Sequence, residues 1–100
     1  MNKNRYPVHF SEEKYMTREA TLADTAALMS SSDYKERFVA EYDQTAIRYN
    51  KLAEMIEKWD NDALDFKPTC PRSTYDMQLD AMKNYLSVLE ARAVMEGITL

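Results

Sequence analysis

The clearest pattern in this chain is a run of mostly apolar positions that follow one another in alternating steps of four and three residues. The run consists of Phe38, Tyr42, Thr45, Tyr49, Leu52, Ile56 and Trp59. Side chains at this spacing lie on one face of an α-helix and form a heptad seam. Asp33 stands before the run, and Glu36 lies three residues after Asp33. This is the arrangement of a capping box at a helix start. The pattern predicts one long amphipathic helix from about Asp33 to Asp60, ended by Asn61 and Asp62.

A second segment repeats this spacing after a break that contains two prolines. Residues 66–71 read Phe-Lys-Pro-Thr-Cys-Pro and exclude regular helix, because proline lacks an amide hydrogen and restricts the residue before it. A second helix is predicted to begin at a cap formed by Ser73 or Thr74 and to end at Gly97. Its apolar positions are Leu79, Met82, Leu86, Leu89 and Ala93. Two amphipathic helices joined by such a loop predict an antiparallel helical hairpin.

The N-terminal part of the chain is predicted to be an arm. Residues 1–20 are mostly polar and keep no sustained period, although a helical turn from Ser11 fits the sequence. A short helix is predicted over residues 21–29, ending at a run of serines. The expected organisation is therefore an arm over residues 1–31, with a short helix, and a helical hairpin domain over residues 32–100. Nothing alternates with period two over the length of a strand, so the predicted fold class is all-α.

Composition narrows the class of protein further. The 100 residues carry 13 basic and 17 acidic side chains, a formal net charge of −4. This balance argues against duplex nucleic acid or an anionic membrane as the partner, since both attract basic surfaces. We expect neither a membrane span nor a signal peptide, because no apolar stretch has the required length. With one cysteine no internal disulfide calls for an oxidising compartment, so a cytoplasmic location is expected.

Residues that commonly carry catalysis or hold metal ions are scarce. His9 is the only histidine, and Cys70, the only cysteine, lies between two prolines with no metal-binding partner close in sequence. A single glycine excludes a Gly-rich phosphate loop. Acidic and basic side chains alternate along the first long helix, which is typical of a solvated face. We therefore expect no enzymatic activity, no metal site and no cofactor.

Two features of the first long helix are compatible with ligand binding. Tyr42 and Tyr49 share one stripe; core packing is the simpler interpretation, but a tyrosine ring at a seam between subunits also stacks on a nucleobase. Arg48, Lys51 and Lys58 add cations to the same helix. A cation binds a nucleotide phosphate strongly where the site is shielded from water. The pattern alone leaves packing and binding open. A short helical chain rich in tyrosine and methionine is also expected to complete its core by forming a homo-oligomer.

The polar residues set among the apolar positions resemble those of a known family. They are Glu36-Arg37, Glu41-Tyr42, Gln78 and Arg92. The accompanying positions are Tyr34-Lys35, Phe38, Arg48, Lys51-Leu52, Met55-Ile56, Leu79, Met82, Tyr85 and Leu89. Over residues 32–97 this pattern resembles the phage anti-CBASS cyclic-oligonucleotide sponges and related small phage and prophage proteins.

This resemblance implies a phage or prophage anti-defence protein that acts in the host bacterial cytoplasm. Proteins of the family are small helical homo-oligomers, implied here to be hexamers, with pockets between protomers. They bind cyclic di- and trinucleotide messengers of a bacterial immune system and cleave no bond. A binder of this kind protects by lowering the concentration of free messenger.

The resemblance also implies residues for the binding site. In the family a tyrosine of the first helix stacks on a base and a lysine near the end of that helix reaches a phosphate. Tyr42 matches the tyrosine, while the lysine's place falls at Glu57 and Lys58 is one residue away. The family's nearby threonine falls at Trp59, which departs from the pattern, as does the long N-terminal arm. The candidate ligand-binding residues are Tyr42, Lys58 and Arg48.

The main alternative is a non-catalytic structural or adaptor protein. In that hypothesis the heptad seam serves only to pair the hairpin with itself or with another protein. A small DNA-binding regulator is disfavoured by the negative charge. An enzyme has the least support, because no acid–base pair or metal cluster can be placed.

Overall fold

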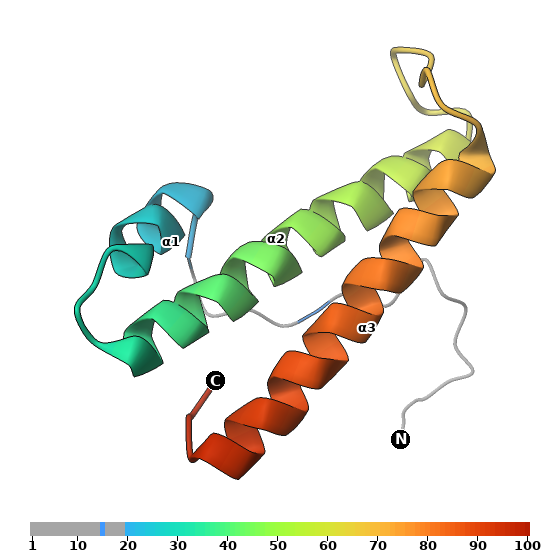
Figure 1. Ribbon diagram of the computed structural model, residues 1–100. Helices are drawn as coiled ribbons and strands as arrows, with labels where there is room; N and C mark the ends of the chain where they lie inside the picture. Colours follow the sequence, from blue (N-terminus) through green and yellow to red (C-terminus); the bar gives the residue numbers. More distant parts are fainter. Residues whose placement is uncertain (1–14, 16–19) are drawn as a thin grey trace, which may run out of the picture.

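The computed structural model describes Tyr15 and residues 20–100, and this part of the chain contains three helices and no strand. The helices are α1 (Leu22–Met29), α2 (Tyr34–Asp60) and α3 (Arg72–Glu96). The all-α prediction is thus confirmed for these residues. Helix α2 is central, with α1 packed against it and α3 running beside it on the return path (Figure 1). The predictions for His9 and for the turn at Ser11 lie outside the described residues.

Helix α2 occupies the predicted range, and its first turn shows how the cap works. The Asp33 side chain accepts a hydrogen bond from the Lys35 backbone N–H at 2.9 Å. Glu36 does not complete a capping box, because the Asp33 N–H donates to the Ser31 hydroxyl, and that hydroxyl donates to the Glu36 carboxylate. The predicted box is therefore wrong in both halves, although Asp33 does cap the helix, because its side chain accepts from the Lys35 N–H and not from that of Glu36. The Ser31 hydroxyl binds both the Asp33 N–H and the Glu36 carboxylate, which would otherwise bind each other.

A reciprocal capping box is instead found at the start of α1. The Thr21 side chain accepts from the Asp24 N–H at 3.1 Å, and the Asp24 carboxylate accepts from the Thr21 N–H at 2.9 Å. Thr25, one turn into the helix, is buried and its hydroxyl donates to the Leu22 carbonyl. The short helix predicted over residues 21–29 is therefore present and begins at a satisfied cap.

Helix α3 begins earlier than predicted. Neither Ser73 nor Thr74 caps it; the N-cap is Pro71, with φ of −60° and no side-chain hydrogen bond. Proline needs no cap for its own nitrogen, which carries no hydrogen, and its ring holds φ near the helical value. The Thr74 N–H donates to the Pro71 carbonyl at 3.0 Å, so the first turn closes there. Gly97 ends α3 as predicted, with φ of 70°.

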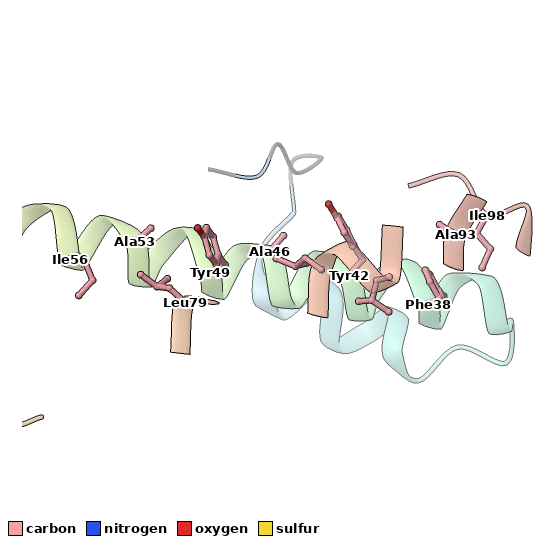
Figure 2. Close-up of a cluster of buried hydrophobic side chains, with 11 residues drawn as sticks. Phe38, Tyr42, Ala46, Tyr49, Ala53, Ile56, Leu79, Ala93 and Ile98 are labelled. Carbon is pink, nitrogen blue, oxygen red and sulfur yellow. The ribbon is translucent and has the colours of Figure 1, made fainter. Parts of the chain in front are cut away.

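The core lies chiefly between α2 and α3 (Figure 2). Its buried members are Phe38, Tyr42, Ala46, Tyr49, Ala53, Ile56, Leu79, Leu86, Leu89, Ala93 and Ile98. Four of the seven predicted seam positions of α2 are among them, and Leu52 and Trp59 pack against the cluster partly buried. The heptad seam is therefore the face of α2 that packs on α3, as its spacing predicts.

Contacts at both ends of the two helices set their antiparallel alignment. Near the start of α2, the Tyr34 hydroxyl donates to Glu96 at 2.6 Å. Near its end, the rings of Trp59 and Tyr75 meet edge to face with centroids 5.8 Å apart. Residues far apart in sequence are thus paired at each end of the helices.

Candidate functional site

Tyr42, the residue most closely tied to the expected ligand, lies in the core. It is 7% exposed, and its hydroxyl donates a 2.5 Å hydrogen bond to Oε2 of Glu90 on α3. Burial, and then the bond to the Glu90 carboxylate, raise the pKa of the Tyr42 hydroxyl well above its ordinary value. In a single chain, Tyr42 occupies the packing position that was the simpler interpretation of its pattern (Figure 2).

Arg48 and Lys58 lie on other faces of α2 and are both exposed. Because an α-helix turns about 100° per residue, Arg48 is about 120° from Tyr42 around the axis and Lys58 about 160°. Lys58 is also about 24 Å from Tyr42 along the axis. The structure therefore does not bring the three predicted residues together within one chain. A ligand that contacts all three needs groups from more than one protomer.

Arg92, one of the polar residues behind the family resemblance, forms contacts within the fold. Arg92 donates to the Tyr34 hydroxyl at 2.9 Å and to Glu96 at 3.1 Å. Its guanidinium carbon lies 5.0 Å from the centroid of the Phe38 ring, within the range of a cation–π contact. Arg92 therefore ties the end of α3 to the start of α2.

Helix α3 exposes a second apolar face, which the sequence analysis missed. We call it the outer stripe; its members are Met77, Ala81, Val88, Ala91 and Met95. Met77 is 70% exposed and Met95 76% exposed. The stripe lies about half a turn from the buried Leu79, Leu86 and Ala93. Exposed apolar surface of this kind is common where proteins bind a partner.

The methionines and alanines of the outer stripe are placed symmetrically about Leu86, whereas the position that mirrors Val88 is the polar Asn84. Met77 and Met95 each lie nine residues from this centre, and Ala81 and Ala91 each lie five residues from it. Two copies packed antiparallel would set methionine against methionine and alanine against alanine. Self-complementarity of this kind is what a two-fold interface requires. The signal was present in the sequence as a second apolar series with steps of four, seven, three and four residues, interrupted at Asn84 and out of phase with the first.

Two hollows lie at opposite ends of α2. One, of about 240 Å³, is lined by Leu28, Lys35, Glu36, Val39, Ile98 and Thr99. The other, of about 200 Å³, is lined by Trp59, Asp62, Leu64, Phe66, Lys67 and Pro68. The second combines aromatic walls with one acidic and one basic side chain, a mixture suited to a polar ligand with a flat ring.

Among the residues that the structure describes, no three histidine, cysteine or acidic side chains are grouped so as to hold a metal ion. No helix in that part of the chain is both long and apolar enough to cross a bilayer. Cys70 is exposed and its thiol is free.

Comparison with known proteins identifies a family over most of the chain. The model of the family described as Sequestin matches residues 32–95. This range covers α2, the loop and nearly all of α3. No curated protein and no solved structure matches the chain.

Proposed function

This chain belongs to the Sequestin family of sponge proteins, and on that basis we propose that it sequesters cyclic di- and trinucleotide messengers of a bacterial immune system. The observation that carries the proposal is the family match over residues 32–95. Sequestration requires binding without catalysis, and protection then follows from mass action, since a tight binder lowers the free messenger available to the effector.

We propose that copies of the chain assemble through the outer stripe. The stripe runs for about 27 Å along α3, from Met77 to Met95, and its symmetric order suits an antiparallel pair. Alanines at the facing positions Ala81 and Ala91 let two helices approach closely. Pairs formed in this way are the units of the larger assembly, a hexamer in our proposal.

The ligand, in this proposal, is held between protomers. Arg48 and Lys58 bind phosphates, and Tyr42 stacks on a base. Only an assembly can bring these residues to one ligand, because they lie on different faces of α2. Tyr42 imposes the strictest condition: its burial and its bond to Glu90 mean that a base reaches the ring only if α3 moves at that point.

The first test is calorimetric titration of the purified protein with a panel of cyclic di- and trinucleotides, with linear dinucleotides as controls. We expect selective binding with fewer ligands bound than protomers present. Absence of binding across the panel, from a folded oligomer, would overturn the proposal.

Variants of the exposed cations test their part in binding. Arg48→Gln and Lys58→Gln are each expected to weaken messenger binding about tenfold, the loss of one charge-assisted hydrogen bond. Lys35→Gln, an exposed lysine near the other end of α2, is the matched control and should bind normally. Equal affinity in all three variants would exclude Arg48 and Lys58 from the site.

Tyr42 needs a substitution that preserves the core. Tyr42→Ala would destabilise the fold by about 3–5 kcal/mol and confuse folding with binding. Tyr42→Leu keeps an apolar side chain but removes the ring, so messenger binding should fall, whereas Tyr42→Phe keeps the ring and should bind at least as well as the wild type. Normal binding by Tyr42→Leu would show that Tyr42 serves packing alone.

A structural or adaptor protein is the second candidate. Two observations favour it: the Tyr42 hydroxyl is satisfied within its own chain, and the exposed outer stripe offers a surface for pairing without a ligand. A stable oligomer that binds nothing in the nucleotide panel would make this the better assignment.

A further inference from the structure

The loop that joins α2 to α3 carries a hollow that neither the core nor the outer stripe uses. We call it the end pocket; it is the 200 Å³ hollow lined by Trp59, Asp62, Leu64, Phe66, Lys67 and Pro68. The loop, yellow to orange in Figure 1, projects beyond the end of α2. A ligand can therefore reach it from solvent without disturbing the helices.

The aromatic wall of the end pocket is held firmly from behind. The Trp59 ring packs edge to face on Tyr75, and the guanidinium carbon of Arg72 lies 5.9 Å from the Trp59 centroid. Arg72 is itself fixed by a 2.9 Å ion pair with Asp60. Phe66, in contrast, is 54% exposed. A fixed tryptophan beside an exposed phenylalanine provides a stacking surface for a flat ring.

Asp62 occupies a backbone position that glycine would fill at lower cost. Its N–H donates to the Trp59 carbonyl at 3.1 Å, and the Ala63 N–H donates to the Lys58 carbonyl at 2.8 Å, which together form a Schellman motif at the end of α2. Asp62 has φ of 54°, in the left-handed region. A carboxylate also interacts unfavourably with the C-terminal end of the helix dipole. Two modest penalties thus fall on a residue whose side chain lines the pocket, at a backbone position that aspartate adopts more readily than most other residues.

The charged groups of the end pocket are available to a ligand. In the described part of the chain, neither Asp62 nor Lys67 forms an ion pair. The pocket therefore presents one acceptor group and one cation beside its aromatic wall. A ligand that satisfies both must carry hydrogen-bond donors and a negative charge on a partly flat body.

We propose that the end pocket binds the guanine base of a phosphate-bearing nucleotide. The base stacks on Phe66 and Trp59, its adjacent N1–H and 2-amino groups donate two hydrogen bonds to the Asp62 carboxylate, and Lys67 binds the phosphate. Pockets for whole small molecules hold roughly 300–1,000 Å³, so this smaller hollow takes the base and leaves the sugar at its rim. The choice of a nucleotide rests on the proposed function; the Asp62 carboxylate specifies guanine.

Fluorescence offers a direct test, because Trp59 is the only tryptophan in the chain. The intact protein is titrated with GMP, with inosine monophosphate, which lacks the 2-amino group, and with AMP. We expect GMP to quench Trp59 saturably, inosine monophosphate to bind about tenfold more weakly, and AMP to bind more weakly still, because each lost donor leaves Asp62 less satisfied. Equal quenching by all three, or none by GMP, would overturn the inference.

Substitution of Asp62 separates binding from stability. Asp62→Gly relieves the left-handed strain and should raise Tm by about 4 °C, while GMP binding falls at least tenfold. Asp62→Asn should lose binding similarly, and Asp65→Asn, an exposed acid of the same loop that does not line the pocket, is the matched control. GMP binding by Asp62→Gly at wild-type affinity would refute the role of the carboxylate.

The two proposals fail in different ways. If cyclic messengers bind by calorimetry while Trp59 fluorescence is unchanged and GMP gives no quenching, the end pocket is not a base site and the proposed function stands. If GMP quenches Trp59 while no cyclic messenger binds, the end pocket stands and sequestration of cyclic messengers does not.

Discussion

Single polar residues align α3 on the start of α2. The Tyr34 hydroxyl, the Arg92 guanidinium and the Glu96 carboxylate form a closed set of hydrogen bonds between 2.6 and 3.1 Å. The hydrogen bond from Tyr34, and then the bond from Arg92, hold the pKa of the Glu96 carboxyl below its ordinary value. The network joins side chains 62 residues apart in sequence, so it forms only when α3 packs beside α2.

This pKa shift predicts a loss of stability in acid. A carboxyl whose pKa is lowered on folding stabilises the protein above its unfolded pKa of about 4.3, and that contribution disappears as pH falls through the folded value. The free energy of unfolding, measured with urea, should therefore fall more from pH 6 to pH 3 in the wild type than in Glu96→Gln. Asp80→Asn, an exposed acid elsewhere on α3, should behave as the wild type. If the free energy of unfolding fell as much in Glu96→Gln as in the wild type, Glu96 would be excluded as a source of the acid sensitivity.

At the scale of the element, α2 owes its definite start to Asp33. Its side chain satisfies the Lys35 N–H, one of the amides that a helix start leaves without a partner. The neighbouring Ser31 shares in the cap through the Asp33 N–H and the Glu36 carboxylate. Because α2 packs against both α1 and α3, we expect loss of the cap at its start to lower the stability of the whole fold.

Removal of this cap has a predictable cost. Asp33→Ala should lower the free energy of unfolding by about 1 kcal/mol, measured by urea denaturation at neutral pH. Ser32→Ala, at the adjacent exposed position, is the control and should unfold as the wild type does. Equal stability of the two variants would show that the cap contributes nothing measurable.

At the scale of the whole molecule, the outer stripe leaves apolar side chains of α3 exposed in the single chain. One face of α3 meets α2, and the opposite face exposes methionine, valine and alanine to solvent. Helices that are apolar on two faces are stable where both faces are covered. A second copy supplies that cover in our proposal.

Charge placed in the outer stripe should therefore dissociate the assembly. Val88→Glu lies on the exposed face, so the chain should keep its helical content while its mass by light scattering falls below that of the wild-type assembly. Val94→Glu places the same charge off the stripe and should leave the mass unchanged. An assembly that survives Val88→Glu would place the interface elsewhere.

The sequence by itself determined the helices and the face of α2 that is buried. Helical periodicity, the two prolines of the loop and the glycine after α3 are local signals, because they act through hydrogen bonds and dihedral angles of neighbouring residues. The predicted range of α2 and the stop at Gly97 are accordingly confirmed. Of its local errors, the box at Glu36 arose where Ser31 competed for the same hydrogen bonds, and the cap at Ser73 or Thr74 arose because α3 begins earlier, after Pro71.

Only the tertiary structure decided how the side chains of these helices are used. The seam places Tyr42 on the buried face, but Glu90, the partner that holds its hydroxyl, is 48 residues away. The end pocket is local in sequence, since its lining residues all lie within residues 59–68, but the path of the loop decided that they surround one hollow. The tertiary structure also decided that the second apolar series of α3 faces solvent and not α2. Burial depends on contacts between distant segments, and a local pattern carries no information about which segments meet.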